Sequence, residues 1–367
     1  MRKRGIALLL CAALLAALAG CGAPRPETDS RMPPAAASES AAPVQALPEP
    51  PRSVEASFPL LSAPFSDAGT EAMVNHNARC CALLSGTQYF CRCLYADGSC
   101  ALVRYEIVDN IPRDRTRLVA DCPADYLCES GGRLYYLNGE ARPESVSFDG
   151  SGRREELDEP CLSLQLFGGA LYCLRADGLL LRVDGGKEAL LAGCAWAFVS
   201  DRGIFYTAAS DGRAHLFDPA ARTDVTLTAE AALSPTLVGT TLLYAADEPD
   251  GRHLRALELS DGTHRRMEAV FEGLPELLLD WDEGWQLRLT ALGGAEGQQL
   301  IAVGAAFEPS PAVRSVPGGE LRRCRGVHDV LHTDELLAPD GSALGFELAM
   351  PVGISTRSLA ADNPPET

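Results

Sequence analysis

Cysteines and histidines are the residues of this chain whose types and spacing could support metal or redox chemistry. The 367 residues contain 13 Cys and six His. Six of the cysteines lie between positions 80 and 122, where Cys80-Cys81 and Cys91-x-Cys93 are close in sequence. Structural zinc sites prefer cysteine pairs separated by roughly two to four residues, and neither pair has this spacing. We therefore predict no metal site and no cofactor.

Disulfide bonding is the second chemistry open to these thiols, and it suits an exported domain. The sequence does not give the pairing. The candidates are Cys80, Cys81, Cys91, Cys93, Cys100, Cys122 and Cys128. The alternative is that many of the cysteines are small buried hydrophobic groups in strands. Cys161 and Cys194 favour this alternative, because a further copy of the same sequence pattern has Ala232 at the equivalent place.

Other motifs yield no catalytic residue. His328 and His332 could share a helix face and bind zinc, but their context predicts a strand, on which they would lie about 13 Å apart. The acidic segments 247–251 and 280–283 lack the ligand spacing of a calcium loop and are predicted to be solvated hairpin tips. The sequence contains no Gly-x-Ser-x-Gly elbow and no phosphate-binding loop.

Cys21 follows a segment with the features of a secretory signal. The basic residues 2–4 precede an apolar run over residues 6–19, which is shorter than the roughly 20 residues of a membrane span. The tetrapeptide Leu18-Ala19-Gly20-Cys21 resembles the lipobox of bacterial lipoproteins. This resemblance implies signal cleavage between Gly20 and Cys21 and a thioether-linked diacylglycerol on Cys21.

Lipidation would place the chain on a membrane. Each buried CH₂ group contributes about 0.8 kcal/mol, so two or three acyl chains such as palmitate hold a protein on a bilayer. We therefore expect the protein to contact membrane lipid through acylated Cys21. Its expected location is the cell membrane, on the extracytoplasmic side.

The composition divides the rest of the chain. Residues 21–57 are rich in Pro, Ala and Ser and show no hydrophobic periodicity, which predicts a disordered tether. The expected organisation is a signal peptide over 1–20, this tether, a β-propeller domain over 58–350 and a polar C-terminal tail over 351–367.

A pattern of short strands and tight turns recurs after about residue 85. In each clear copy a turn leads into an aromatic or aliphatic strand, then an Asp-Gly or Asn-Gly turn, then an alternating strand. Such turns are strong hairpin signals, because their residues readily adopt positive φ. The copies are marked by seven equivalent positions, 33 to 46 residues apart: Gln88, Leu134, Leu171, Ile204, Leu242, Leu287 and Leu331.

Periods near 40 residues with several short strands each predict a β-propeller. We expect an all-β fold with about seven four-stranded blades. Six or eight blades stay open, because the terminal copies are degenerate, and a pair of β-sandwiches or a solenoid is the alternative architecture. Propellers often close by pairing their chain ends in one blade, and residues 58–84 are expected to supply the missing strand.

The repeats resemble those of bacterial extracytoplasmic propellers of the TolB-, quinoprotein- and Kelch-like kind, over residues 86–350. The repeats do not each contain the Gly-His and Trp-Asp pair of WD40 repeats, and the Asp-box of sialidases is absent. The chain has three Trp, Trp196, Trp281 and Trp285, where quinone-binding repeats would have paired tryptophans. The resemblance therefore implies a fold and no particular activity.

The acidic composition narrows the choice of partners. The formal net charge is −18, and a protein that binds nucleic acid needs a cationic surface. We expect a monomeric, non-enzymatic lipoprotein whose propeller binds a protein, peptide or glycan. One alternative is a scaffold for envelope protein assembly. Another is a lyase or hydrolase with a site in the central channel, whose candidate residues by repeat position are Tyr135, Tyr206, Arg213, His215 and His253.

Overall fold

The computed structural model describes residues 47–65, 69, 72–73, 76–77, 79, 82–95, 99–108, 111–268 and 270, followed by a series of strands between 274 and 345. The strands after residue 270 are described by their backbone. The predicted signal peptide, Cys21, most of the predicted tether and the predicted tail over 351–367 lie outside the described residues.

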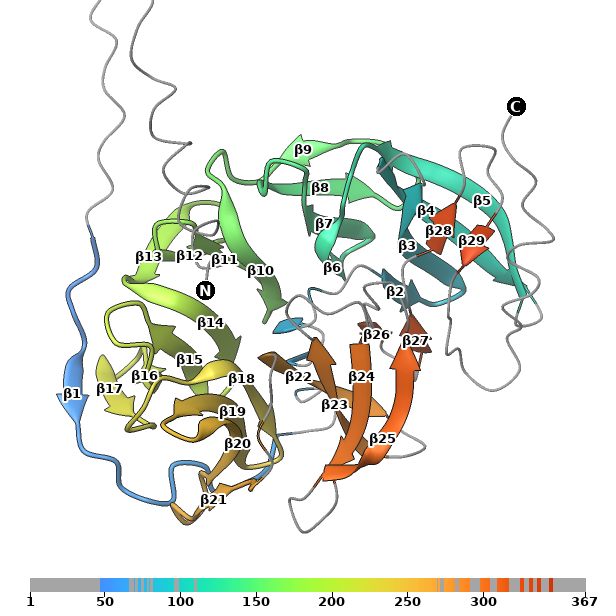
Figure 1. The fold of residues 1–367 in the computed structure, drawn as a ribbon. Helices are drawn as coiled ribbons and strands as arrows, with labels where there is room; N and C mark the ends of the chain where they lie inside the picture. The colour runs from blue at the N-terminus through green and yellow to red at the C-terminus, as the bar shows by residue number, and fades with distance from the viewer. Residues whose placement is uncertain are drawn as a thin grey trace, which may run out of the picture. The chain divides into compact units, whose positions relative to one another are not determined.

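Six sheets within the described residues each contain four consecutive antiparallel strands (Figure 1). The first two sheets consist of β2 (Ala82–Ser85), β3 (Gln88–Tyr95), β4 (Cys100–Val108), β5 (Ile111–Ala120), and β6 (Asp125–Ser130), β7 (Arg133–Leu137), β8 (Pro143–Ser147), β9 (Arg154–Glu155). The third and fourth consist of β10 (Cys161–Phe167), β11 (Ala170–Arg175), β12 (Leu180–Val183), β13 (Lys187–Leu191), and β14 (Cys194–Ser200), β15 (Gly203–Ala208), β16 (Ala214–Asp218), β17 (Thr223–Thr226). The fifth and sixth consist of β18 (Leu233–Val238), β19 (Thr241–Glu248), β20 (Gly251–Glu258), β21 (His264–Arg266), and β22 (Leu274–Asp280), β23 (Gly284–Thr290), β24 (Gln298–Val303), β25 (Pro309–Val316).

This repeated four-stranded meander is the blade of a β-propeller, and it confirms the predicted all-β fold class. Each of the seven positions that mark the sequence repeats lies in the second strand of its unit, in β3, β7, β11, β15, β19, β23 and β27 (Val330–His332). In the seventh unit the described residues form the two-stranded sheet of β26 (Cys324–Gly326) and β27. The total number of blades stays a prediction.

Two extra strand pairings depart from the sequence-based expectation. The strand β1 (Arg52–Val54) lies inside the segment predicted to be a disordered tether, and it pairs in parallel with β17 at the edge of the fourth sheet. The strand β28 (Glu335–Leu337) pairs in parallel with β3, and β29 (Ala343–Gly345) pairs with β28. The first sheet is therefore extended by the C-terminal part of the chain, while residues 82–84, from the segment expected to supply the missing strand, form most of β2 in the same sheet.

The hydrophobic core lies between neighbouring sheets. Alternate side chains of a strand belong to different clusters, as period-two patterning requires. On β7, Leu134 and Tyr136 pack with the first sheet, whereas Leu137 packs with the third. The fourth and fifth sheets share a cluster that also contains Leu61 and Met73, from the segment that precedes β2.

A recurrent backbone contact joins the second, third, fourth and fifth sheets in succession. The amide at the start of the first strand donates a hydrogen bond to a carbonyl in a turn of the preceding sheet: Cys161 N to Ala141 O at 2.8 Å, Cys194 N to Gly178 O at 3.0 Å and Ala232 N to Gly212 O at 2.9 Å. The donor residues are all buried. Cysteine and alanine thus occupy equivalent buried positions beside this backbone contact.

The Asp-Gly turns act as the sequence predicts. In the β11–β12 turn, the Asp177 carboxylate accepts the Leu179 amide at 3.2 Å, and Gly178 has φ +82°. The Asn-Gly turn differs, because there the residue with positive φ is Ala141 (φ 58°), and Asn138 instead accepts backbone amides through its side chain.

Residues 72–73 and 76–77 are helical. Within the part of the chain that the structure describes, no helix combines the length and apolar character needed to cross a bilayer.

Gly262 provides a test of how the segment before β2 packs. A Cβ atom there would lie 2.7 Å from the ring of Phe58, and Gly262 also has φ +81°. Gly185 has a comparable φ of +63° with no atom near its missing Cβ. Backbone strain alone costs about 1 kcal/mol, so Gly185→Ala should lose that amount. We expect Gly262→Ala to lose at least about 1 kcal/mol more, measured by urea denaturation. Equal losses would contradict the packing of Phe58 against this turn.

Candidate functional site

The first strands of the sheets meet at the centre of the propeller, where ligands of such folds are commonly bound. Among them, β10 contacts both β6 and β14, β2 contacts β6, and β18 contacts β22. The chain immediately before β2 reaches this centre. We call the described residues of 58–79 the N-terminal strap.

The strap is fixed along the fifth sheet before it reaches the centre. The amides of Leu60 and Leu61 donate to the carbonyl of Leu259 at 2.8 and 3.1 Å, and the amide of Phe65 donates to that of Gly239 at 3.0 Å. Met73 is fully buried in the cluster between the fourth and fifth sheets.

His76 is surrounded by aromatic rings from two of the first strands. Its imidazole centroid lies 5.4 Å from that of Tyr126 on β6, and 6.2 and 5.6 Å from those of Trp196 and Phe198 on β14. Neither ring nitrogen has a hydrogen-bond partner. Burial lowers the pKa of His76 to about 4, although the nearby main chain opposes this in part. The imidazole is therefore neutral at neutral pH.

Asn77 connects two first strands by hydrogen bonds. Its amide nitrogen donates to the carbonyl of Pro235 at 2.6 Å and to the hydroxyl of Thr236, both on β18. Its amide oxygen accepts the indole N–H of Trp196 on β14 at 2.9 Å. Side chains of the strap thus occupy the space between β6, β14 and β18. Sequence analysis missed both residues, because nothing in the local pattern around 76–77 indicates burial.

Tyr206 and His215, two of the candidates by repeat position, do lie together. The hydroxyl of Tyr206 donates to Asp224 Oδ1 at 3.0 Å, and His215 Nδ1 is 2.9 Å from Asp224 Oδ2. The two rings stack with centroids 4.9 Å apart. The trio comes from the adjacent strands β15, β16 and β17 of one sheet, and His215 Nε2 is buried without a hydrogen-bond partner. The group is thus enclosed within the core and does not line a cleft.

The other candidates are dispersed. Tyr135 packs against the cluster between the second and third sheets. Arg213 is exposed, 3.7 Å from the Asp211 carboxylate. His253 is on β20 of the fifth sheet. The structure therefore brings two of the five predicted candidates together and separates the remaining three.

His253 belongs to a cluster whose ligand geometry would suit a metal ion. Ligand atoms of Glu248, Asp250 and His253 lie within 4.8 Å of one another. The guanidinium of Arg266 donates to all three, at 3.0, 2.7 and 2.8 Å respectively. Because His253 Nε2 accepts from Arg266, its Nδ1 carries the proton and donates to the carbonyl of Met267 at 3.0 Å. The positive charge that this cluster attracts is therefore supplied by an arginine.

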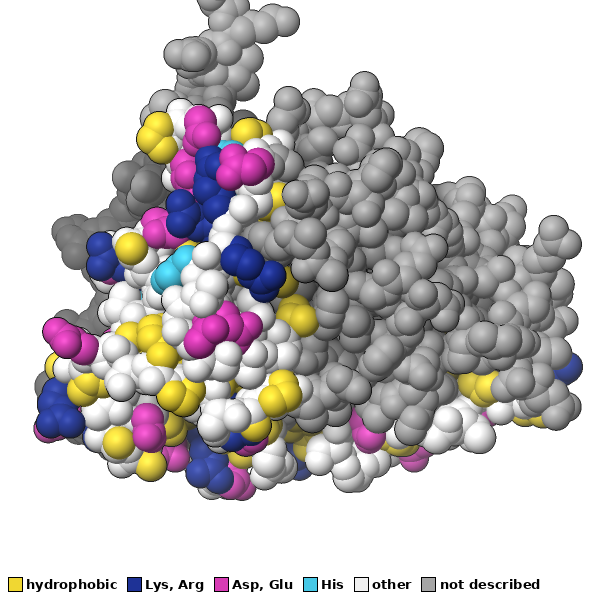
Figure 2. Space-filling view, turned by 90° about the horizontal axis from the view of Figure 1, so that it is seen from below, with side chains coloured by type: hydrophobic (Ala, Val, Ile, Leu, Met, Phe, Trp, Pro, Cys, Tyr) yellow, Lys and Arg dark blue, Asp and Glu magenta, His cyan; other side chains and the backbone are white. Residues whose placement is uncertain are grey.

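Ion pairs of this kind are common on the described surface. Figure 2 shows basic and acidic side chains next to one another on the described part of one face. Burial would raise the pKa of Glu248, but hydrogen bonds from Arg255 and Arg266 outweigh it and lower that pKa. Such a mixed surface offers no basic stripe for a nucleic-acid backbone within these residues.

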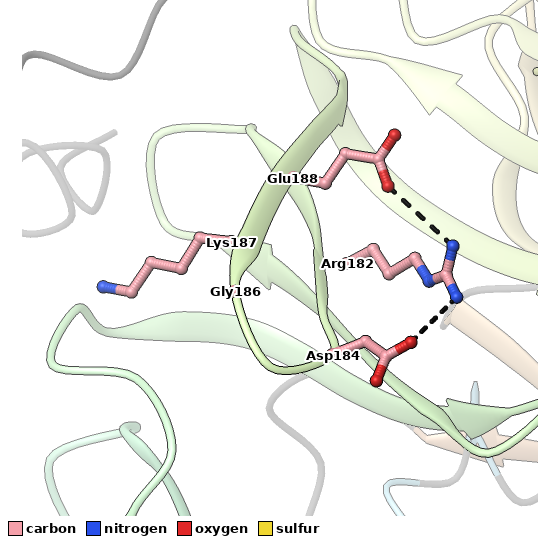
Figure 3. Close-up of a pocket in the computed structure, with 5 residues that line it drawn as sticks. All are labelled: Arg182, Asp184, Gly186, Lys187 and Glu188. Carbon is pink, nitrogen blue, oxygen red and sulfur yellow. Dashed lines mark hydrogen bonds and ion pairs between the residues drawn. The ribbon is translucent and has the colours of Figure 1, made fainter.

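A pocket of about 230 Å³ lies at the β12–β13 hairpin. Its lining consists of Arg182, Asp184, Gly186, Lys187 and Glu188. Arg182 lies between two carboxylates, 3.0 Å from Asp184 and 3.9 Å from Glu188, while the Lys187 side chain points away from it (Figure 3). These charges neutralise one another, and nothing apolar converges here, so the pocket resembles a hydrated surface hollow.

The cysteines with disulfide potential are only partly described. Cys91, Cys122 and Cys128 hold free thiols. Burial raises the pKa of both Cys122 and Cys128 to about 12, which keeps them protonated. Cys80, Cys81 and the side chain of Cys93 lie outside the described residues, and Cys100 contributes a backbone carbonyl to the Cys122 amide at 3.2 Å. Disulfide bonding among the seven stays a prediction.

Some of the histidines and acidic residues considered in the sequence analysis lie outside the described residues. His328 and residues 281–283 lie outside the described residues, and His332 is described by its backbone in β27. The acidic segment 247–251 forms the β19–β20 turn, as expected of a hairpin tip.

Comparison with known proteins gives structural similarity without a family. No protein-family model matches the sequence, and no curated protein does. The computationally designed protein Ika8 has a TM-score of 0.44 and 12% identity over 73% of this chain and 86% of that one. BamB from Moraxella catarrhalis has a TM-score of 0.41 and 11% identity over 73% and 87%. A chain from a Saccharomyces cerevisiae Dbp5 complex has a TM-score of 0.45 and 11% sequence identity, and the match covers 80% of this chain and 92% of that one. The assignment of the fold rests on the strand order above.

Burial of His76 makes the stability of the protein depend on pH. The unfolded chain takes up a proton near pH 6.5 and the folded chain near pH 4, so lowering the pH between these values favours unfolding. The free energy of unfolding should fall by up to about 3 kcal/mol over this range. His76→Leu should lack this component in urea titrations at successive pH values, whereas the exposed control His264→Leu should retain it. Parallel profiles for the natural chain and His76→Leu would contradict a buried neutral imidazole.

Asp224 should matter for stability because it accepts two buried hydrogen bonds. In Asp224→Asn one carboxylate oxygen becomes an NH₂ group that faces a donor, either Tyr206 or His215. We expect a loss of about 2 kcal/mol, measured by thermal or urea unfolding. The exposed Asp201→Asn should change stability by less than about 0.5 kcal/mol. A neutral Asp224→Asn would show that the trio is dispensable for the packing of the fourth sheet.

Proposed function

We propose that this chain is a membrane-anchored extracytoplasmic lipoprotein, acylated at Cys21, whose β-propeller is a non-enzymatic interaction module. The partner class is a protein, peptide or glycan. The observation that supports the proposal is that His76 and Asn77 occupy the space between β6, β14 and β18, where an enzyme of this architecture would be expected to bind its substrate.

The other described groups support an interaction role over catalysis. The Tyr206, His215 and Asp224 side chains are hydrogen-bonded to one another inside a sheet, and all three residues are buried. General acid–base chemistry requires the reacting proton to lie within hydrogen-bond reach of the side chain. What the propeller presents to a partner is its hairpin turns on a rigid set of sheets, and loops on rigid scaffolds are the usual carriers of binding function.

The anchoring part of this proposal rests on the sequence around Cys21. After cleavage the chain would lose residues 2–4, three of its basic residues, and become more acidic. An acidic domain is repelled by anionic headgroups, so an acyl anchor and a Pro-rich tether would hold it near the membrane without pressing it onto the surface.

Metabolic labelling tests the anchor. Cells fed an alkyne-bearing palmitate analogue should incorporate the label into the full chain, and the label should disappear in Cys21→Ser. Cys11→Ser, which alters a cysteine inside the predicted signal, is the matched control and should keep the label. Labelling of Cys21→Ser, or absence of label from the natural chain, would contradict lipidation at this residue.

Cross-linking in intact cells tests the interaction role. The natural chain should yield defined heavier species on a denaturing gel, and their amount should fall when Cys21→Ser releases the domain from the membrane. The variant His76→Leu, altered in the centre, should give the natural pattern, because the proposed contacts involve outer loops. A chain that remains uncross-linked throughout would contradict an interaction module.

A further inference from the structure

One position on the second strand of each sheet is a tyrosine in three of the sheets and a cysteine in the third sheet. Two residues after the repeat-marking residue of the second strand, three of the sheets have a buried tyrosine: Tyr136, Tyr206 and Tyr244. Each tyrosine hydroxyl donates to a carboxylate, at 3.1, 3.0 and 2.8 Å respectively. The third sheet has Cys173 at this position.

A second cysteine faces Cys173 from the neighbouring strand. Cys161 begins β10, at the position occupied by Cys194 and Ala232 in the next two sheets. In the pairing of β10 with β11, Cys161 lies opposite Arg175 and Leu164 lies opposite Cys173. The register shifts between Cys161 and Ser163. Both thiols lie in the cluster between the second and third sheets, so they share one face of the third sheet.

Both cysteines hold free thiols on the same face of adjacent strands. The Cys161 thiol donates to the carbonyl of Glu159 at 3.5 Å, and the neighbouring Cys161 side chain and burial together raise the pKa of Cys173. Cys161 is 3% exposed and Cys173 fully buried.

We propose that Cys161 and Cys173 form a disulfide bond within the third sheet of the propeller. The bond forms as an external disulfide oxidant accepts two electrons: each cysteine loses its thiol proton, one S–S bond forms here, and the oxidant's S–S bond is reduced to two thiols. The proposal rests on the export proposed above, because disulfides persist in oxidising compartments.

The timing of this reaction follows from burial. The thiolate is the reactive species in disulfide exchange, and both sulfur atoms are inaccessible once the second and third sheets have packed. The bond therefore forms while the third sheet is still open, and the packed sheets then protect it from reduction. A bond made in this way links adjacent strands of one sheet and leaves the contacts between sheets unchanged.

The chain offers a direct readout, because a single tryptic peptide, 155–175, contains both cysteines and no others. The purified full chain is refolded in a buffer of reduced and oxidised glutathione, unfolded in N-ethylmaleimide and digested. We expect this peptide to be lighter by two hydrogen atoms and to carry no alkyl group. A peptide carrying two alkyl groups would overturn the proposal.

Competing pairings are visible in the same digest. Cys128 lies in the same cluster and belongs to the tryptic peptide 118–133. A cross-link between this peptide and 155–175 would overturn the Cys161–Cys173 pairing in favour of one that joins two sheets.

Two variants and one native sample complete the test. Cys161→Ala should leave peptide 155–175 with one alkyl group, and Ala232 shows that alanine is accepted at this position. Cys194→Ala, at the equivalent position of the fourth sheet, should retain the bond. In chain isolated from its own cells after alkylation, the bond should also be present. A bond that forms in the glutathione buffer but is missing in cells would contradict export and leave the pairing intact.

Discussion

The close seating of each sheet on its predecessor is the contact on which the rest of this fold depends. At three successive junctions, the amide of a small residue at or next to the start of the first strand donates to a turn carbonyl of the sheet before it. These residues are Cys161, Cys194 and Ala232, and all three are buried. Alternate side chains of described strands such as β7 belong to different clusters between neighbouring sheets, and this buried apolar area stabilises the fold.

The centre of the propeller is completed by chain from outside the repeats. His76 packs among the aromatic rings there, and Asn77 accepts the hydrogen bond of the Trp196 indole N–H. A ligand or a longer side chain could occupy the same space in another propeller. The arrangement is costly in one respect, since the imidazole of His76 is buried without a hydrogen bond. It indicates that the described residues between β6, β14 and β18 are part of the folded core.

The repeats could be predicted because their signals are local. An Asp-Gly turn such as Asp177-Gly178 and an alternating strand beside it can be read within ten residues, and this sufficed to place seven second strands. The strap could not be predicted in the same way, because Asn77 acquires its partners on β18 more than 150 residues later. Asp224 illustrates the intermediate case. Its neighbours Tyr206 and His215 stood out by repeat position, but the carboxylate joins them only through the register of β16 and β17.

The pairing of β1 with β17 determines which contacts would resist a force applied to the N-terminal part of the chain. Because β1 runs parallel to β17 at the edge of the fourth sheet, a force applied ahead of residue 52 acts along the strand, and the β1–β17 hydrogen bonds share it. The N-terminal strap, which follows β1, would then be shielded from that load. The chain ahead of residue 52 could in this way be pulled without loosening the packing of His76.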